Sequence, residues 1–321
     1  MKNKIIIVGG DPNSINSELI FKSWMKINNS LKKKIYLISN YELISKQLKT
    51  LNYKMRIKKV KNIYEEGKKN ELKIINIDLK FSNPFKVNKS DASKFVQASL
   101  NYAHKSALSA QVKGIINCAI NKNLLNKQKI GVTEYLASKS DVKNNSEVML
   151  IRNNKLSVSP LTTHIDIKQV AEKIKKLLII NKVKVIQKWF YEKFHRKPKI
   201  AILGLNPHNA EYRKNSEEHK EIIPAILSLK RLGIKITGPL ASDTIFISDF
   251  KNYDIIIGMF HDQVLAPFKS LFKYDAINIT LGLKYLRASP DHGTAADIIG
   301  KNKADPKSLL KCINFINKFG K

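Results

Sequence analysis

Apolar residues occur along the chain in short runs, and these runs alternate with longer stretches in which apolar positions recur every three or four residues. Short runs rich in isoleucine and valine predict buried strands, and the longer periodic stretches predict amphipathic helices. Strands are expected at Ile5–Val8, Ile35–Ile38, Ile74–Ile77, Ile115–Cys118, Ile200–Leu205, Ile234–Thr237, Asp254–Met259 and Ala276–Thr280. The alternation of strands and helices is typical of an α/β fold.

The helices expected between these strands have recognisable start and stop signals. The clearest helix begins after Ser90-Asp91, a predicted N-cap, and places Phe95, Val96, Leu100, Ala103 and Ala107 on one face. Further helices are expected from Ile167 to about Ile180, from Glu217 to Leu232 just before Gly233, and after Asp305-Pro306. Because the sequence contains no flexible linker, any domain boundary is expected at a crossover of the chain.

Length and composition limit the class of protein. A chain of 321 residues suits two domains or one large α/β domain, and 43% hydrophobic residues can build a sizeable core. No apolar run approaches the roughly 20 residues of a membrane span, and Ile5–Val8 is too short for a signal peptide. The two cysteines, Cys118 and Cys312, lie in apolar segments, which favours free thiols in a reducing cytoplasm. We therefore expect a cytoplasmic protein without membrane contact.

The net charge of +32, from 58 basic and 26 acidic residues, raises the question of nucleic-acid binding. Only six of the basic residues are arginines, whereas proteins that read nucleic acids rely on arginine for bidentate contacts. The lysines are spread over the whole chain among asparagine and isoleucine. We therefore favour a lysine-rich overall composition over a nucleic-acid partner.

Three of the seven histidines lie in loop-like sequence at or near predicted strand ends: His164, His208 and His261. Ligands of α/β proteins bind outside the carboxyl ends of parallel strands, and three imidazoles suit a divalent metal of borderline softness. A single histidine is more often structural, and we interpret His104, His195 and His219 in that way.

Other polar residues lie near these histidines in the sequence. Asp243 and Asp262 are candidates for orienting a histidine, contacting the metal or acting as general base, although Asp243 is equally well interpreted as a helix N-cap. Lys269, Asn278 and Arg287 lie nine residues apart, just after His261, and suit a phosphate or carboxylate, although a lysine near any motif is expected by chance in this chain.

A short loop with small residues, Asp291-His292-Gly293-Thr294-Ala295-Ala296-Asp297, opens a predicted helix. Such a loop allows close approach of a phosphate, and a carboxylate such as Asp297 suits a ribose hydroxyl. A plain turn from strand to helix is an equally good interpretation. The glycine fingerprint of the common dinucleotide-binding fold is absent, so NAD would bind by another route.

Together these motifs resemble the 4-hydroxythreonine-4-phosphate dehydrogenase (PdxA) family over essentially the whole chain. The resemblance is strongest in Pro160-Leu161-Thr162-Thr163-His164, Leu205-Asn206-Pro207-His208, Gly238-Pro239…Asp243-Thr244, His261-Asp262-Gln263 and Leu281-Gly282-Leu283…Arg287. It implies two α/β domains of the isocitrate/isopropylmalate dehydrogenase type, with the active site in the cleft between them at a dimer interface. The expected domains are residues 1–130 with 288–321, and residues 131–287.

The resemblance also implies roles for individual residues. His164, His208 and His261 would hold a divalent metal, zinc or else magnesium, manganese or cobalt, with ligands drawn from both subunits of a homodimer. Thr133, Lys269, Asn278 and Arg287 would bind substrate. His292, Gly293, Thr294, Ala295 and Asp297 would bind the adenosine half of NAD. The implied reaction is oxidation of 4-phosphohydroxy-L-threonine, followed by decarboxylation towards 3-amino-2-oxopropyl phosphate, on the route to pyridoxal phosphate.

The chain departs from the family pattern in two places. Val132 replaces a histidine that precedes the substrate-binding threonine, and Asp11-Pro12-Asn13-Ser14-Ile15-Asn16-Ser17-Glu18 lacks two glycines and a proline of the family turn. The change at Val132 motivates one alternative, a paralogue that oxidises 4-phospho-threonate or erythronate. A second alternative, motivated by the charge, is a non-catalytic nucleic-acid-binding protein.

Overall fold

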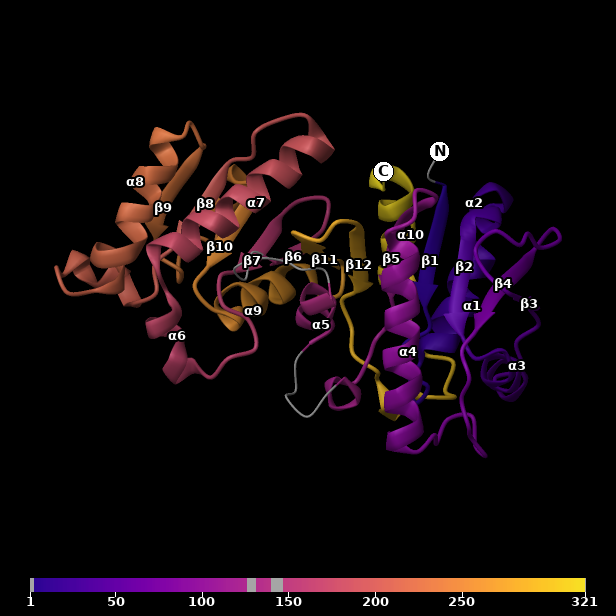
Figure 1. The fold of residues 1–321 in the computed structure, drawn as a ribbon. Coiled ribbons are helices and arrows are strands. Elements are labelled where there is room, and N and C mark those ends of the chain that lie inside the picture. The colour runs from indigo at the N-terminus through magenta and orange to yellow at the C-terminus, as the bar shows by residue number, and fades with distance from the viewer. Residues whose placement is uncertain (1–2, 126–130, 140–146, 321) are drawn as a thin grey trace. The chain divides into compact units, whose positions relative to one another are not determined.

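The computed structural model describes residues 3–125, 131–139 and 147–320 (Figure 1). The chain forms two compact units, unit 1 with Met1–Ser140 and Leu283–Lys321, and unit 2 with Asp141–Gly282. Thr133 and Arg287 therefore lie in unit 1, whereas the sequence analysis assigned both to the other domain. The reason is local packing, because the strand of Arg287 pairs within the sheet of unit 1 and the helix of Thr133 packs on a helix of the same unit. Residue 130, one expected boundary, lies outside the described residues.

Unit 1 is built on a parallel sheet. In spatial order its strands are β3 (Arg56–Val60), β4 (Glu71–Asn76), β2 (Ile35–Ser39), β1 (Lys4–Val8), β5 (Val112–Asn117) and β12 (Leu286–Pro290). Every residue of β1 and β2 is buried, as expected for strands covered on both faces.

Helices cover both faces of this sheet. They are α1 (Asn16–Lys26), α2 (Asn29–Lys34), α3 (Tyr41–Thr50), α4 (Lys89–Ala107), η1 (Lys122–Leu124), α5 (Val132–Lys139), η6 (Ala296–Ile298) and α10 (Lys307–Phe319). The apolar face of α4 packs on Ile6 and Tyr36, and α10 packs on β5 and β12. The start of α4 differs from the prediction, because Asn88 is its N-cap and accepts a hydrogen bond from the backbone of Asp91.

Unit 2 contains a mixed sheet. In spatial order its strands are β11 (Ile277–Leu281), β6 (Val148–Arg152), β7 (Ser157–Pro160), β10 (Ile255–Gly258), β8 (Ile200–Leu203) and β9 (Ile236–Leu240). The pairs of β6 with β11 and with β7 are antiparallel, whereas β7, β10, β8 and β9 run parallel to one another. The parallel strands bring their carboxyl ends to one edge.

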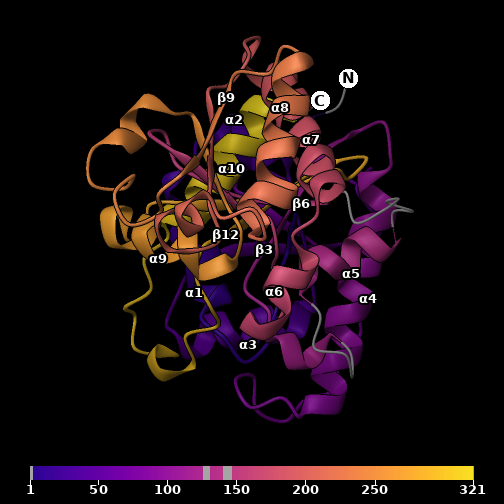
Figure 2. The same cartoon turned by 90° about the vertical axis from the view of Figure 1, so that its left-hand side faces the viewer.

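The helical segments of unit 2 are α6 (Ile167–Lys173), α7 (Lys176–Phe194), η3 (Pro207–Tyr212), η4 (Glu218–Ile222), α8 (Ile223–Arg231), η5 (Asp249–Asn252) and α9 (His261–Phe272). Helices α7 and α8 lie side by side (Figures 1 and 2). The single helix predicted from Ile167 to about Ile180 is wrong. The chain leaves the helical conformation at Ile174, and α7 starts where the distant Glu221 carboxylate accepts a hydrogen bond from the backbone of Lys176 at 2.7 Å.

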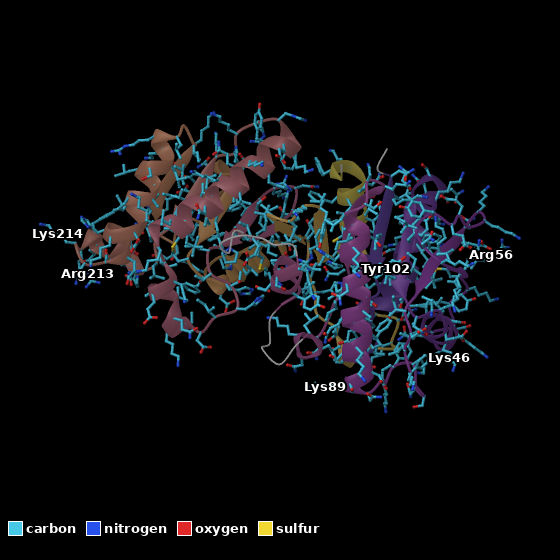
Figure 3. The ribbon with its side chains drawn as sticks, in the orientation of Figure 1. Lys46, Arg56, Lys89, Tyr102, Arg213 and Lys214 are labelled. Atoms are coloured by element: carbon cyan, nitrogen blue, oxygen red, sulfur yellow. The ribbon has the colours of Figure 1, made fainter. Side chains whose placement is uncertain are left out.

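The basic side chains are distributed over both units. Lys46, Arg56 and Lys89 extend from unit 1, and Arg213 and Lys214 extend from unit 2 (Figure 3). Among the described residues, no helix is long and apolar enough to cross a membrane.

Candidate active site

The three predicted metal-binding histidines follow three neighbouring parallel strands of unit 2. His164 comes four residues after β7, His208 five residues after β8, and His261 three residues after β10. The sequence prediction that His208 and His261 follow parallel strands is confirmed.

Hydrogen bonds join the loops that carry these histidines. The backbone N–H of Leu161 donates to the carbonyl of Gly258 at 2.7 Å. The buried hydroxyl of Thr162 donates to the carbonyl of Met259 at 2.7 Å, which connects the His164 loop to the His261 loop. The amide of Gln263 accepts from Met259 N at 2.6 Å and donates to the carbonyl of Gly204 at 2.7 Å, which connects the His261 loop to the His208 loop.

Thr162 and Gln263 lie inside motifs that the sequence analysis quoted, but it gave neither residue a role. Their partners are main-chain atoms of distant loops, which no local pattern indicates. A polar residue inside a motif, one or two positions from a predicted ligand, is the only signal that could have pointed to them.

The structure brings two of the histidines together within one chain. The ring centroids of His164 and His261 lie 6.0 Å apart. Nδ1 of His261 lies 2.6 Å from Asp262 Oδ1, so that Nε2 is the ring nitrogen that remains for a ligand. Among the residues that the structure describes, no three His, Cys, Asp or Glu side chains lie close enough to hold a metal ion. Within the described residues, His208 thus forms no three-residue group with His164 and His261.

The remaining predicted residues of unit 2 lie on separate elements. Asp243 is exposed in a turn after β9 and does not cap a helix, since Ser248 is the N-cap of η5. Lys269 is half-buried on α9, and Asn278 is half-buried on β11 in register with Ile151 of β6.

Two predicted substrate-binding residues meet in unit 1. The guanidinium of Arg287, which is 3% exposed, donates from Nη1 to the Thr133 hydroxyl at 3.3 Å and from Nε to Asn117 Oδ1 at 2.6 Å. Burial lowers the pKa of Arg287 to about 10, so that the side chain stays charged at neutral pH. Asn117, at the end of β5, was not predicted, and it fixes the plane of the guanidinium. The result is a buried, oriented positive charge suited to an anionic group.

The predicted cofactor loop is anchored to the N-terminal part of unit 1. Thr294 O accepts from Ile15 N at 3.2 Å, and Ala304 N donates to Glu18 Oε1 at 2.8 Å. His292 Nδ1 lies 2.8 Å from the carbonyl of Gly293, and a side chain added at Gly293 would meet open space. Ala295 caps the short helix η6, in which Asp297 is exposed.

The altered turn at residues 11–18 is held by side chains where the family has glycine. The amide of Asn16 donates to the carbonyls of Gly9 at 2.9 Å and Ala119 at 2.8 Å. The Ser14 hydroxyl donates to the carbonyl of Asp11 at 2.5 Å. Within the described part of the chain, the buried atoms Asn16 Oδ1 and Ser17 Oγ have no hydrogen-bond partner. Both belong to the start of α1, whose first turn lies next to the cofactor loop.

Val132, the other departure, starts α5 and packs against the apolar core of unit 1. Its side chain is half-buried and offers no hydrogen bond. Val132 therefore contributes core packing at this position, and the neighbouring Thr133 is bonded to Arg287.

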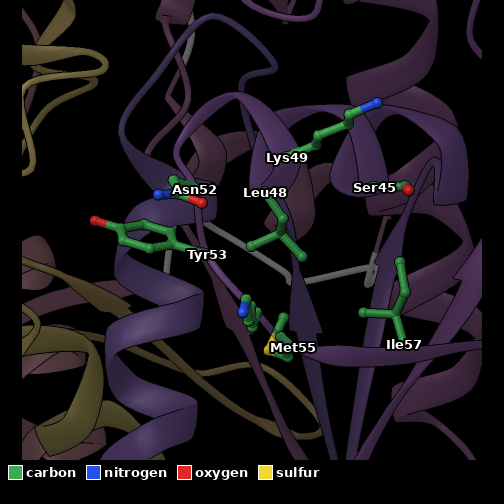
Figure 4. Close-up of a pocket in the computed structure, with 8 residues that line it drawn as sticks. Ser45, Leu48, Lys49, Asn52, Tyr53, Met55 and Ile57 are labelled. Carbon is green, nitrogen blue, oxygen red and sulfur yellow. The ribbon is translucent and has the colours of Figure 1, made fainter.

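A cavity of about 290 Å³ lies in unit 1 between α3 and β3, with Ser45, Leu48, Tyr53, Met55 and Ile57 among its lining residues (Figure 4). None of the predicted site residues contributes to it.

In unit 2, parallel strands are followed by imidazoles at their carboxyl ends, and in unit 1 a strand carries a buried arginine. Both features are typical of α/β enzymes. The family model for "Pyridoxal phosphate biosynthetic protein PdxA" matches residues 31–316. The 4-hydroxythreonine-4-phosphate dehydrogenase of Sulfurihydrogenibium sp. is 38% identical, over 97% of this chain and 96% of its own. The chain belongs to the PdxA family, and it is a dehydrogenase of pyridoxal phosphate biosynthesis.

Solved structures agree with this assignment. A 4-hydroxythreonine-4-phosphate dehydrogenase from Klebsiella pneumoniae has a TM-score of 0.83 at 27% identity, covering 98% of each chain. An isocitrate dehydrogenase from Methylococcus capsulatus has a TM-score of 0.50 at 9% identity, covering 98% of this chain and 85% of that one. The predicted α/β fold and dehydrogenase class are confirmed, and the alternative of a non-catalytic nucleic-acid-binding protein is wrong.

Proposed function

We propose that this enzyme oxidises the 3-hydroxyl of 4-phosphohydroxy-L-threonine with NAD and yields 3-amino-2-oxopropyl phosphate. A hydride leaves C3 for the nicotinamide, the hydroxyl proton passes to a base, and the resulting 3-oxo acid loses its carboxylate as carbon dioxide. The observation that carries the proposal is the similarity to 4-hydroxythreonine-4-phosphate dehydrogenases along nearly the whole chain.

Arg287 and Thr133 are the residues that we propose for anchoring an anionic group of the substrate. Their mutual hydrogen bond and the burial of the guanidinium support this role, since an oriented arginine fork matches the oxygens of a phosphate or carboxylate. Lys269 and Asn278 would supply a second charge and a further hydrogen bond, because the substrate carries an anion at each end.

His164, His208 and His261 would hold a divalent cation, with zinc as the first choice and magnesium, manganese or cobalt as others. When bound, such a cation would polarise the substrate hydroxyl and stabilise the negative charge that develops on its oxygen as the proton leaves. The proximity of the His164 and His261 rings and the bond from His261 to Asp262 support the fit. Asp262 would orient His261, and Asp243 stays a candidate for the general base.

The loop of His292, Gly293, Thr294, Ala295 and Asp297 would bind the adenosine half of NAD. The open space at Gly293 and the unpartnered polar atoms at the start of α1 support the fit. A carboxylate at Asp297 favours the ribose hydroxyl of NAD over the 2′-phosphate of NADP.

We further propose a homodimer with ligands of each metal site drawn from both subunits, located in the cytoplasm. The incomplete histidine set within one chain supports the shared site. Cys118 and Cys312 are free and buried, and burial raises the pKa of the Cys118 thiol to about 12, which suits a reducing compartment.

The test is NADH production by the purified protein with 4-phosphohydroxy-L-threonine and, in parallel, with 4-phospho-threonate, each with and without a chelator. We expect chelator-sensitive turnover of the threonine derivative. Turnover of the threonate alone would favour the paralogue that Val132 motivates, and turnover that no chelator affects would contradict the metal site.

A further inference from the structure

The turn that carries His208 has an unusual backbone. Residues 208–212 all have φ between +48° and +56°, in the left-handed region. None of these residues is a glycine: they are His208, Asn209, Ala210, Glu211 and Tyr212. A residue with a Cβ is disfavoured in this conformation, and a run of five is found only where the surroundings hold it in place.

A single buried carboxylate holds the entrance to this turn. Glu218 has no exposed surface, and its Oε1 accepts hydrogen bonds from the backbone N–H groups of Leu205 and Asn206, each at 2.8 Å. Its Oε2 accepts from the Asn206 side chain at 3.0 Å. Bonds to a charged acceptor are stronger than bonds to a neutral one, so Glu218 fixes the two residues that precede Pro207 and His208.

The packing around this carboxylate leaves little freedom for the turn. A Cβ at Gly204 would lie 2.3 Å from Asn209 Oδ1 and 3.2 Å from Glu218 Oε1. The amide of Asn209 also donates to the carbonyl of Pro239 at 3.2 Å. The left-handed turn is thus held at its entrance by hydrogen bonds to Glu218 and at its second residue by the Asn209 side chain, while His208 is exposed.

We propose that Glu218 is a positioning residue for the metal site, because it holds the strained turn in the one conformation that presents His208. The inference rests on the proposed role of His208 as a metal ligand. Glu218 is fully buried and its carboxylate is occupied by three hydrogen bonds, so it acts on His208 through the backbone of Leu205 and Asn206.

The test uses the full-length protein and Glu218→Gln, which keeps the size of the side chain but removes its charge and one acceptor. Amide hydrogen exchange of peptides spanning residues 205–212 measures how readily the backbone of the turn opens. Affinity for Co²⁺ and the visible absorption spectrum of the cobalt-loaded protein measure the geometry of the ligand. We expect faster exchange, a changed spectrum and an affinity reduced about 10- to 100-fold.

Two further variants separate positioning from general stability. Glu217→Gln is the matched control, because Glu217 Oε2 accepts from the Asn206 side chain at 2.9 Å but from neither backbone N–H. We expect it to behave like the wild type. Tyr212→Gly in the Glu218→Gln background should restore affinity and spectrum, since glycine adopts the left-handed conformation without strain and the Tyr212 side chain is 57% exposed.

Unchanged exchange and affinity in Glu218→Gln would overturn the proposal, and so would equal losses in Glu217→Gln or a failure of Tyr212→Gly to restore the spectrum. His208→Ala distinguishes this failure from that of the proposed metal site. Cobalt binding that His208→Ala leaves intact would overturn the metal assignment of His208, and with it the positioning role, even if Glu218→Gln still accelerates exchange.

Discussion

Arg287 of unit 1 is buried and Arg152 of unit 2 is half-buried, and their surroundings differ. Arg287 is bonded to Asn117 and Thr133 at a strand end of unit 1. Arg152 of unit 2 donates to the Ser157 hydroxyl at 2.8 Å and lies over the Phe194 ring at 4.5 Å. Burial lowers the pKa of each arginine to about 10. We propose a substrate-binding role for Arg287 and a structural role for Arg152, and substitution can distinguish the two.

Replacing Arg287 by lysine is expected to lower kcat/KM about 10- to 100-fold, because one charge-assisted hydrogen bond of about 1.5–3 kcal/mol to the substrate is lost. Steady-state kinetics with the phosphorylated substrate measure the effect. Arg152→Lys is the matched control and should leave kcat/KM unchanged while it lowers stability. Equal catalytic losses in both variants would remove the substrate-binding role of Arg287.

Lys73 illustrates a buried charge outside the proposed site. Its side chain is 2% exposed, its Nζ lies 4.2 Å from the centre of the Tyr36 ring and 3.9 Å from Glu66 Oε2, and it donates to the carbonyl of Lys33. Burial lowers the pKa of Lys73 from 10.5 to about 8, and the nearby Glu66 only partly compensates. Between these pH values the unfolded chain binds more protons than the folded chain, so the stability should rise with pH.

We therefore expect the Lys73 contribution to the free energy of unfolding to rise by about 3 kcal/mol between pH 8 and 10.5, at 1.36 kcal/mol per pKa unit. In Lys73→Met this contribution is absent. Urea denaturation of both proteins across this range measures it, and the difference between their stabilities should change with pH. Two curves that stay parallel would show that Lys73 keeps an ordinary pKa.

At the scale of elements, the isoleucine-rich runs that were predicted as strands are strands, whereas four strands with other sequence patterns were missed. Each strand expected from an apolar run is present, with ends shifted by a few residues. Four strands were not predicted: β3 (RIKKV), β6 (VMLIR), β7 (SVSP) and β12 (LRASP). Of these, β6 is a buried apolar run that the prediction overlooked. β3 is half-exposed at the edge of its sheet, and β12 buries Arg287 and Ser289, so neither shows the apolar pattern of a strand.

At the candidate site, too, some residues could be predicted from the sequence and others could not. The histidines proposed as metal ligands, Arg287 and Thr133 could be named from the sequence motifs, because these motifs contain the residues for which we propose ligand contacts. The residues that hold them in place could not, since Thr162, Gln263 and Glu218 bond to main-chain atoms of other loops. Their role depends on which loops the sheet brings together, and this information is not local in the sequence.

Strand β9 yields a prediction at this scale. A Cβ at Gly238 would lie 2.3 Å from the carbonyl oxygen of Ile202 on β8, and the φ of Gly238 is +147°. Gly238→Ala is expected to destabilise the protein by about 3 kcal/mol, because β9 must move away from β8 or the backbone must strain. Chemical denaturation measures the loss. Gly293→Ala, which meets open space, is the control and should stay within about 0.5 kcal/mol of the wild type.

At the scale of the whole molecule, the incomplete histidine set within one chain leads to a test of subunit sharing. His208→Ala and His261→Ala should each be inactive, because each removes one of three ligands from every site. If His208 and His261 of one site come from different subunits, a mixed dimer contains one site with both substitutions and one site with neither. Mixing equal amounts after reversible dissociation should then restore about a quarter of the wild-type activity, since half of the dimers are mixed and each has one intact site.

Activity and bound metal are measured before and after mixing, and His208→Ala mixed with a His164→Ala/His208→Ala double variant is the control that should stay inactive. A mixture of the single variants that stays inactive, although mass spectrometry detects mixed dimers, would show that His208 and His261 serve the same site from one chain.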